Sequence, residues 1–189
     1  MKKTALLLFF LFPQFLSAQY NYEPSEEYPF GRINPSARGE LADFQPLIGE
    51  SECSSVTRNP DQSWADPVPM LWRFKYIMDG MAVQDETLKE DGTHSGSIRQ
   101  FNSDSLAWYV HYYASAGAAP VLPVWEGSKK DDGNIVLYRP QVAPNGMEGY
   151  YRLTFFDISD DNFEWIGEWV DLTEKIIFPT WKISCTKKD

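Results

Sequence analysis

The sequence has few of the residues from which metal centres are built. Among its 189 residues are two histidines, His94 and His111, and two cysteines, Cys53 and Cys185. Neither pair has the short spacing of zinc ligands, and the aspartates within residues 157–161 do not follow the spacing of an EF-hand loop. We therefore predict no metal site.

Motifs for nucleotide cofactors and for a catalytic nucleophile are also lacking. The sequence contains neither a P-loop nor a dinucleotide-binding fingerprint. The segment Gly92-Thr93-His94-Ser95-Gly96 places its serine one residue away from the G-x-S-x-G pattern. It also follows a turn between two expected strands, whereas that motif leads from a strand into a helix. We predict no cofactor and assign no catalytic residue.

Positive charge is scarce relative to negative charge. Lysine and arginine total 17 residues and aspartate and glutamate total 27, so the formal net charge is −10. A protein this acidic repels phosphate backbones, and we therefore expect no nucleic-acid partner.

The one long apolar run lies at the N-terminus. It covers residues 5–12, follows two lysines and precedes small residues that end at Ala18. This order is typical of a secretory signal peptide, and the run is too short to span a bilayer. We predict that residues 1–18 are a signal peptide and that the mature chain begins at Gln19. The protein is then exported, either periplasmic or secreted, with no stable membrane anchor.

The clearest structural signal in the remaining sequence is a meander in residues 68–101. The dipeptides Asp79-Gly80 and Asp91-Gly92 divide it into three runs of alternating apolar and polar residues. Asp-Gly between such runs favours a tight hairpin, because both central residues of a type I′ turn need positive φ. The segment therefore predicts three antiparallel strands.

The first of these turns also predicts a register. A two-residue turn sets Arg73 opposite Glu86 on the outer face and Phe74 opposite Asp85 on the inner face. Burial disfavours a charged carboxylate, so Asp85 is expected to be neutral or paired with an inward cation or several donors. A different turn length sends Asp85 to solvent instead.

The rest of the chain repeats the same alternation of short strands and turns. No window has helical periodicity, so we predict an all-β fold: a single antiparallel up-and-down β-barrel of about ten strands in residues 44–189. An extended or disordered segment, residues 19–43, precedes it, and residues 39–47 suit a short helical turn that plugs one end. The expected strands are residues 48–58, three within 68–101, then 106–114, 121–127, 135–142, 147–158, 163–172 and 176–187.

The two cysteines suit a disulfide in such a barrel. An even cysteine count in an exported protein favours pairing. Cys53 lies in the first expected strand and Cys185 in the last, and closure of the barrel makes these strands neighbours. Two buried free thiols are the alternative.

Inward-facing aromatic side chains are the candidate ligand contacts. Aromatic residues make up 15% of the chain. Eight strands enclose a core that side chains fill or that holds one small ligand, and ten strands leave more room. The alternative is that these side chains only fill the core. The candidate ligand-binding residues are Trp72, Phe74, Tyr76, Asp85, Trp108, Tyr112, Trp165 and Trp169.

Residues 44–187 resemble the lipocalin-like, or calycin-type, β-barrels. Phe44-Gln45-Pro46-Leu47-Ile48-Gly49 resembles the start of the first strand in that group, and Ile98-Arg99-Gln100-Phe101 lies in a similar glycine-containing meander. The strand count is similar to that of nitrobindin-like barrels, including bacterial families of unknown function. The resemblance implies the barrel fold.

The sequence departs from these groups at two informative places. Lipocalins usually carry tryptophan two residues after the first-strand glycine, where this chain has Ser51. Nitrobindins bind haem through a histidine late in the chain, but neither His94 nor His111 lies in the last strands. The resemblance therefore does not imply haem binding.

Three functional hypotheses follow. The leading one is an exported lipocalin-like barrel that binds a small, mostly apolar or aromatic ligand in its interior. The second is a barrel enzyme that uses Asp85 as an acid or base. The third is an interaction module with a filled core, which acts through exposed aromatic residues or strand edges.

Overall fold

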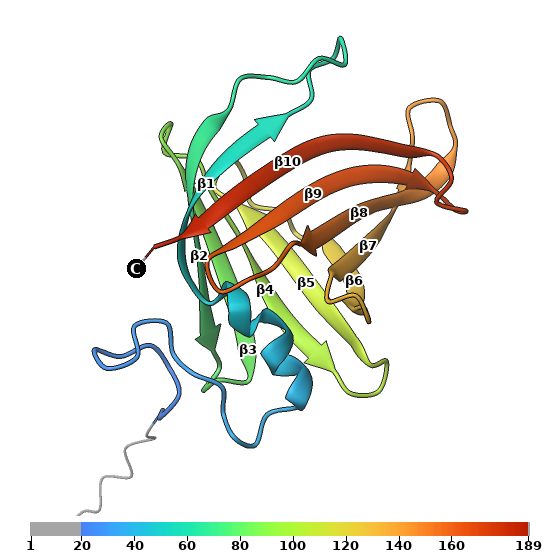
Figure 1. The fold of residues 1–189 in the computed structure, drawn as a ribbon. Coiled ribbons are helices and arrows are strands. Elements are labelled where there is room, and N and C mark those ends of the chain that lie inside the picture. Colours follow the sequence, from blue (N-terminus) through green and yellow to red (C-terminus); the bar gives the residue numbers. More distant parts are fainter. Residues whose placement is uncertain (1–19, 189) are drawn as a thin grey trace, which may run out of the picture.

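The computed structural model describes residues 20–188 (Figure 1). The predicted signal peptide, residues 1–18, lies outside the described residues. Within residues 20–188, no helix has the length and apolar composition that a membrane span requires.

The described chain forms a closed barrel in which every strand is antiparallel to its sequence neighbour and β10 closes on β1. This confirms the prediction of an all-β, ten-stranded up-and-down barrel. The elements are the 3₁₀ helix η1 (Gly39–Leu47) and the strands β1 (Gly49–Thr57), β2 (Val68–Ile77), β3 (Ala82–Lys89), β4 (His94–Asn102), β5 (Ala107–Ala114), β6 (Val124–Lys129), β7 (Ile135–Val142), β8 (Glu148–Phe156), β9 (Asn162–Asp171) and β10 (Ile177–Lys187).

The predicted register between β2 and β3 is confirmed. Phe74 lies opposite Asp85, and Arg73 lies opposite Glu86. Because successive side chains alternate between the two faces of a strand, this register buries Asp85 inside the barrel.

The turn between these strands is longer than predicted. The last ladder pair is Ile77 with Ala82, so four residues form the loop, and Met78, Asp79 and Gly80 all have positive φ. The loop has one more residue on each side than the predicted two-residue turn, so the register between β2 and β3 is unchanged. Met78, which alternation places on the buried face, is 53% exposed because it belongs to the loop.

The N-terminal segment packs against this turn. Residues 20–38 contain no helix or strand, but the amides of Tyr22 and Asp79 donate to the side chains of Asp79 and Glu23, at 3.0 and 2.6 Å. A Cβ atom on Gly80 would lie 2.4 Å from the carbonyl oxygen of Arg32. Glycine is therefore required at residue 80 by this close approach as well as by its φ of +77°.

Helix η1 closes the lower end of the barrel as drawn in Figure 1. Its residues Leu41, Phe44 and Leu47 are buried at spacing three, the spacing that puts them on one side of a 3₁₀ helix. The Phe44 ring meets the edge of Trp108 at a centroid distance of 4.8 Å. We call the end of the barrel that η1 covers the closed end. The opposite end, where the β1–β2, β3–β4, β5–β6, β7–β8 and β9–β10 connections lie, is the open end.

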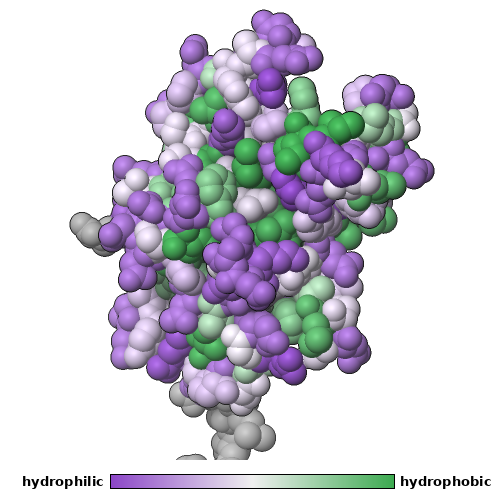
Figure 2. Space-filling model, turned by 45° about the vertical axis from the view of Figure 1, so that its right-hand side comes forward, coloured by the Kyte–Doolittle hydropathy of each residue, from purple (hydrophilic) through white to green (hydrophobic). Residues whose placement is uncertain are grey.

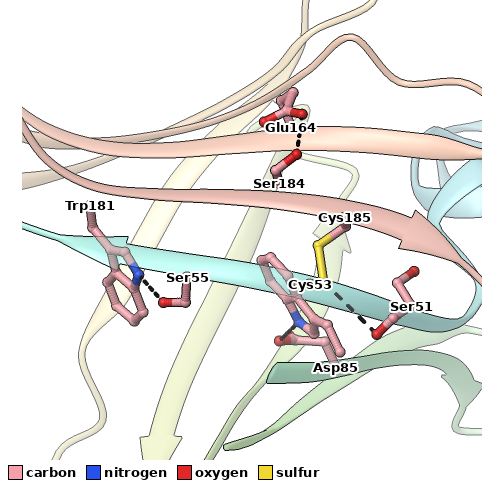
Figure 3. The surroundings of a disulfide bond; sticks show 9 residues. Ser51, Cys53, Ser55, Asp85, Glu164, Trp181, Ser184 and Cys185 are labelled. Carbon is pink, nitrogen blue, oxygen red and sulfur yellow. Dashed lines mark hydrogen bonds between the residues drawn. A yellow bond between two sulfur atoms is a disulfide. The ribbon is translucent and has the colours of Figure 1, made fainter. Parts of the chain in front are cut away.

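The Cys53–Cys185 disulfide joins the first and last strands, which confirms the predicted pairing (Figure 3). The two residues are register partners on β1 and β10, with a Cα–Cα distance of 4.1 Å. The bond therefore fastens the seam at which the barrel closes.

Loss of the disulfide should destabilise the barrel without changing its topology. The bond closes a sequence separation of 132 residues, and the chain-entropy treatment gives about 4–5 kcal/mol for such a loop. We expect the double variant Cys53→Ser/Cys185→Ser to lose unfolding free energy of this order in urea denaturation. Reductant should lower the wild-type midpoint and leave the variant's midpoint unchanged. Equal midpoints for oxidised wild type and variant would contradict this role.

Candidate functional site: the barrel cavity

The interior of the barrel is filled with aromatic side chains near the closed end. Phe44, Phe74, Trp108, Phe155 and Phe163 are all at most 1% exposed. Several of their rings meet edge to face, as in the pairs of Phe44 with Trp108 and Phe74 with Phe163. These rings form a packed aromatic layer in this half of the barrel.

The other half, toward the open end, holds a cavity of about 390 Å³. Two facing walls of the cavity differ in chemistry. One wall carries hydroxyl and charged side chains from β3 and β4, and the facing wall carries aromatic side chains from β8, β9 and β10. The polar wall comprises Asp85, Thr87, Ser95, Ser97 and Arg99, and the aromatic wall comprises Tyr151, Phe155, Trp165 and Trp181.

An ion pair forms the floor of the cavity. The Arg99 guanidinium donates to one oxygen of Asp85, and the Trp72 indole N–H donates to the other at 2.8 Å. The side chains of Arg99 and Asp85 are only 3% and 4% exposed. Asp85 is therefore paired with an inward cation, one of the two states that its predicted position allowed.

Aromatic rings surround the cation of this pair. The guanidinium carbon of Arg99 lies 5.1, 5.0 and 5.8 Å from the ring centroids of Phe44, Phe74 and Phe155. The ring faces carry negative potential, so they offset part of the solvation that burial removes. Among residues 20–188, Nε of Arg99 has no hydrogen-bond partner.

Hydrogen bonds orient the aromatic wall. The indole N–H of Trp181 donates to the Ser55 hydroxyl at 2.8 Å across the β1–β10 seam (Figure 3). The hydroxyls of Tyr151 and Thr180 lie 2.8 Å apart. Burial raises the pKa of Tyr151, and the bond to Thr180 and the charge of Arg139 oppose that rise. Tyr151 is therefore a neutral hydroxyl at physiological pH.

The mouth of the cavity carries a stacked arginine. The Arg139 guanidinium lies over the ring of Trp125, 4.5 Å from its centroid, and both residues line the cavity. Gln141, two residues further along β7, lines the same edge. A shallower apolar groove shares Gln141 and Tyr151 with the cavity and runs outward between the β7–β8 and β9–β10 hairpins.

The rim around this groove is unusually apolar for a surface. Met147, Ile176 and Phe178 are between 37% and 51% exposed. On the face drawn in Figure 2, a cluster of apolar surface lies at the upper right, and smaller apolar areas lie lower on the same face among hydrophilic residues.

The structure separates the eight candidate ligand contacts into three groups. Those that line the cavity are Trp72, Asp85, Tyr112 and Trp165. Those buried in the barrel but not lining the cavity are Phe74, Tyr76 and Trp108. Trp169 lines the outer groove and donates its indole N–H to the Gln141 carbonyl at 3.1 Å.

Several lining residues were missed by sequence reasoning. Arg99 lies across the β3–β4 ladder from Val83, on the inner face, and it becomes the partner of Asp85. Alternation along β4, β7 and β10 places Arg99, Arg139 and Trp181 inward, so the same pattern that selected Trp72 could have found them. In residues 20–188, no group of three or more histidine, cysteine, aspartate or glutamate side chains could hold a metal ion.

Comparison with known proteins gives the fold a context. No protein-family model and no curated protein matches the chain. The crystal structure of Rv2717c from M. tuberculosis is similar, with a TM-score of 0.53, 11% identity, and coverage of 82% of this chain and 100% of that one. The chain has a calycin-like β-barrel fold.

A second solved structure is the S-type phycobiliprotein lyase CPES from Guillardia theta, with a TM-score of 0.48, 8% identity, and coverage of 80% of this chain and 98% of that one. At 11% identity, the similarity to Rv2717c shows a shared fold alone. The predicted resemblance to calycin-type barrels, nitrobindin-like ones among them, is confirmed at that level.

The buried ion pair should be sensitive to loss of either partner. We expect Asp85→Asn to lower the unfolding free energy by about 3–5 kcal/mol, because it leaves the Arg99 charge buried without a counter-charge. The adjacent variant Glu86→Gln is the control. Glu86 faces outward and forms an exposed ion pair with Lys75, at 3.6 Å, so its loss should cost less than about 1 kcal/mol. Equal losses of unfolding free energy for Asp85→Asn and Glu86→Gln in urea denaturation would refute a stabilising role for the Asp85–Arg99 pair.

Proposed function

We propose that the protein binds a small, mostly apolar or aromatic molecule inside the barrel. The observation that carries this proposal is the cavity of about 390 Å³ between a hydroxyl-rich wall and an aromatic wall. Ligand sites typically occupy about 300–1,000 Å³ and combine apolar surface with a few placed polar groups. A flat molecule with one polar edge matches the two walls.

The proposal assigns different roles to the candidate residues. Trp72, Tyr112 and Trp165 contact the ligand, and Asp85 shapes the polar floor through its bond to Trp72 and its pair with Arg99. The three that do not line the cavity, Phe74, Tyr76 and Trp108, build the packed layer beneath the floor, and Trp169 borders the path toward the groove.

We propose export as part of this function. The signal-peptide pattern of residues 1–18 supports a mature chain that begins at Gln19, periplasmic or secreted. The Cys53–Cys185 bond supports the same location, because disulfides persist in oxidising compartments.

The two alternative functions have less support. An acid or base role for Asp85 requires a free carboxylate oxygen, and its two oxygens accept from Arg99 and Trp72. An interaction module with a filled core is less consistent with the cavity.

Filling the cavity should abolish ligand binding. Ser97 lines the cavity and is 6% exposed, whereas Ser54 faces outward on β1. We expect the fluorescent neutral probe N-phenyl-1-naphthylamine to bind wild type at one site. Ser97→Phe should weaken this binding at least tenfold, or about 1.4 kcal/mol, and Ser54→Phe should leave it unchanged.

Thermal denaturation of each variant controls for folding, and Ser97→Leu provides a milder substitution if the phenylalanine variant fails to fold. Two results would overturn the proposal. One is the absence of probe binding to folded wild type, and the other is equal binding by wild type and a folded Ser97 variant.

A further inference from the structure

The charged side chains that line the cavity are not balanced. They are Asp85, Arg99 and Arg139. Asp85 and Arg99 neutralise each other at the floor. Within residues 20–188, the Arg139 side chain forms no ion pair and no hydrogen bond, and its guanidinium lies over the ring of Trp125. The lining therefore carries one unmatched positive charge, in a protein whose formal net charge is −10.

The arginine is held in a defined position. Its strand partner across β7 and β8 is Tyr151, and its guanidinium lies 4.5 Å from the centroid of the Trp125 ring. Stacking on an aromatic face fixes the plane of a guanidinium and leaves its N–H groups free to donate. A fork of parallel N–H donors fits the two oxygens of a carboxylate.

Two buried polar atoms beside Arg139 also have no partner. Among residues 20–188, these are Nε1 of Trp125 and Oε1 of Gln141, and both residues line the cavity. An unpaired buried polar atom is unfavourable, and the Trp125 N–H would regain a hydrogen bond from a ligand acceptor, whereas Oε1 of Gln141 is itself an acceptor. Trp125 can only donate, and the Gln141 amide can present its NH₂ group after a half-turn.

The surroundings also favour a negative group at this place. Of the carboxylates within residues 20–188, Asp85 alone lines the cavity, and it is already paired.

We infer that the ligand bears a carboxylate, bound by Arg139 with Trp125 and Gln141, while its apolar or aromatic body lies against Tyr151, Trp165 and Trp181. This inference rests on the proposed function, since it names the chemical class of the molecule that occupies the same cavity. A neutral ligand would leave Arg139 unmatched, and a cationic ligand would be repelled by it.

The test compares two compounds of the same shape, 2-naphthoate and 2-naphthamide, by displacement of N-phenyl-1-naphthylamine. We expect wild type to bind the carboxylate about tenfold or more tightly than the amide, because a charge-assisted bidentate contact forms only with the carboxylate. Arg139→Gln should reduce this ratio to about one while changing the amide's affinity by less than about twofold.

Two further variants make the result specific. Arg73→Gln removes the same charge from the outer surface, where Arg73 pairs with Glu50 at 2.5 Å, and it should keep the wild-type ratio. Arg139→Lys keeps the positive charge but lacks the parallel N–H donors of the guanidinium, so its carboxylate-to-amide ratio should lie between those of wild type and Arg139→Gln. It also replaces Arg139→Gln if that variant does not fold.

The outcomes separate this inference from the proposed function. If both compounds displace the probe equally from wild type, or if folded Arg139→Gln keeps the preference for naphthoate, the carboxylate site is refuted while ligand binding stands. If the probe itself does not bind folded wild type, the proposed function fails and the inference fails with it.

Discussion

The buried ion pair of Asp85 and Arg99 determines how the interior of this barrel is divided. Neither charge can stay in an apolar interior alone, so each requires the other, and the Trp72 indole satisfies the second carboxylate oxygen. Phenylalanine rings surround the guanidinium on the side of the closed end. The pair thus forms a polar floor, with a packed aromatic layer on one side and the cavity on the other.

The elements around this floor enclose it in a closed barrel. Helix η1 supplies the plug at the closed end, and the disulfide fastens β1 to β10. The cavity wall on β3 and β4 is polar and the facing wall is aromatic. Under the proposed function, this difference gives a bound molecule a preferred orientation. The stacked Arg139 at the mouth adds a directional charge to that preference.

Much of the fold follows from the sequence, because alternation and Asp-Gly turns are local signals. They predicted about ten strands, which the closed strand order confirms, and the inward position of Asp85, which its register with Phe74 confirms. The candidate site was only partly predicted. Trp72 and Phe74 follow the same alternation, yet one lines the cavity and the other is buried beneath it. Their difference depends on how deeply η1 fills the barrel, which is a property of tertiary packing.

The measurement that tests the central claim most directly is native mass spectrometry of the mature protein purified from its own host. The account predicts one small molecule per protein chain, with an aromatic or apolar body, that is lost on denaturation. A native spectrum with only the apoprotein mass, unchanged after incubation of the folded protein with an extract of the host's small molecules, would contradict it.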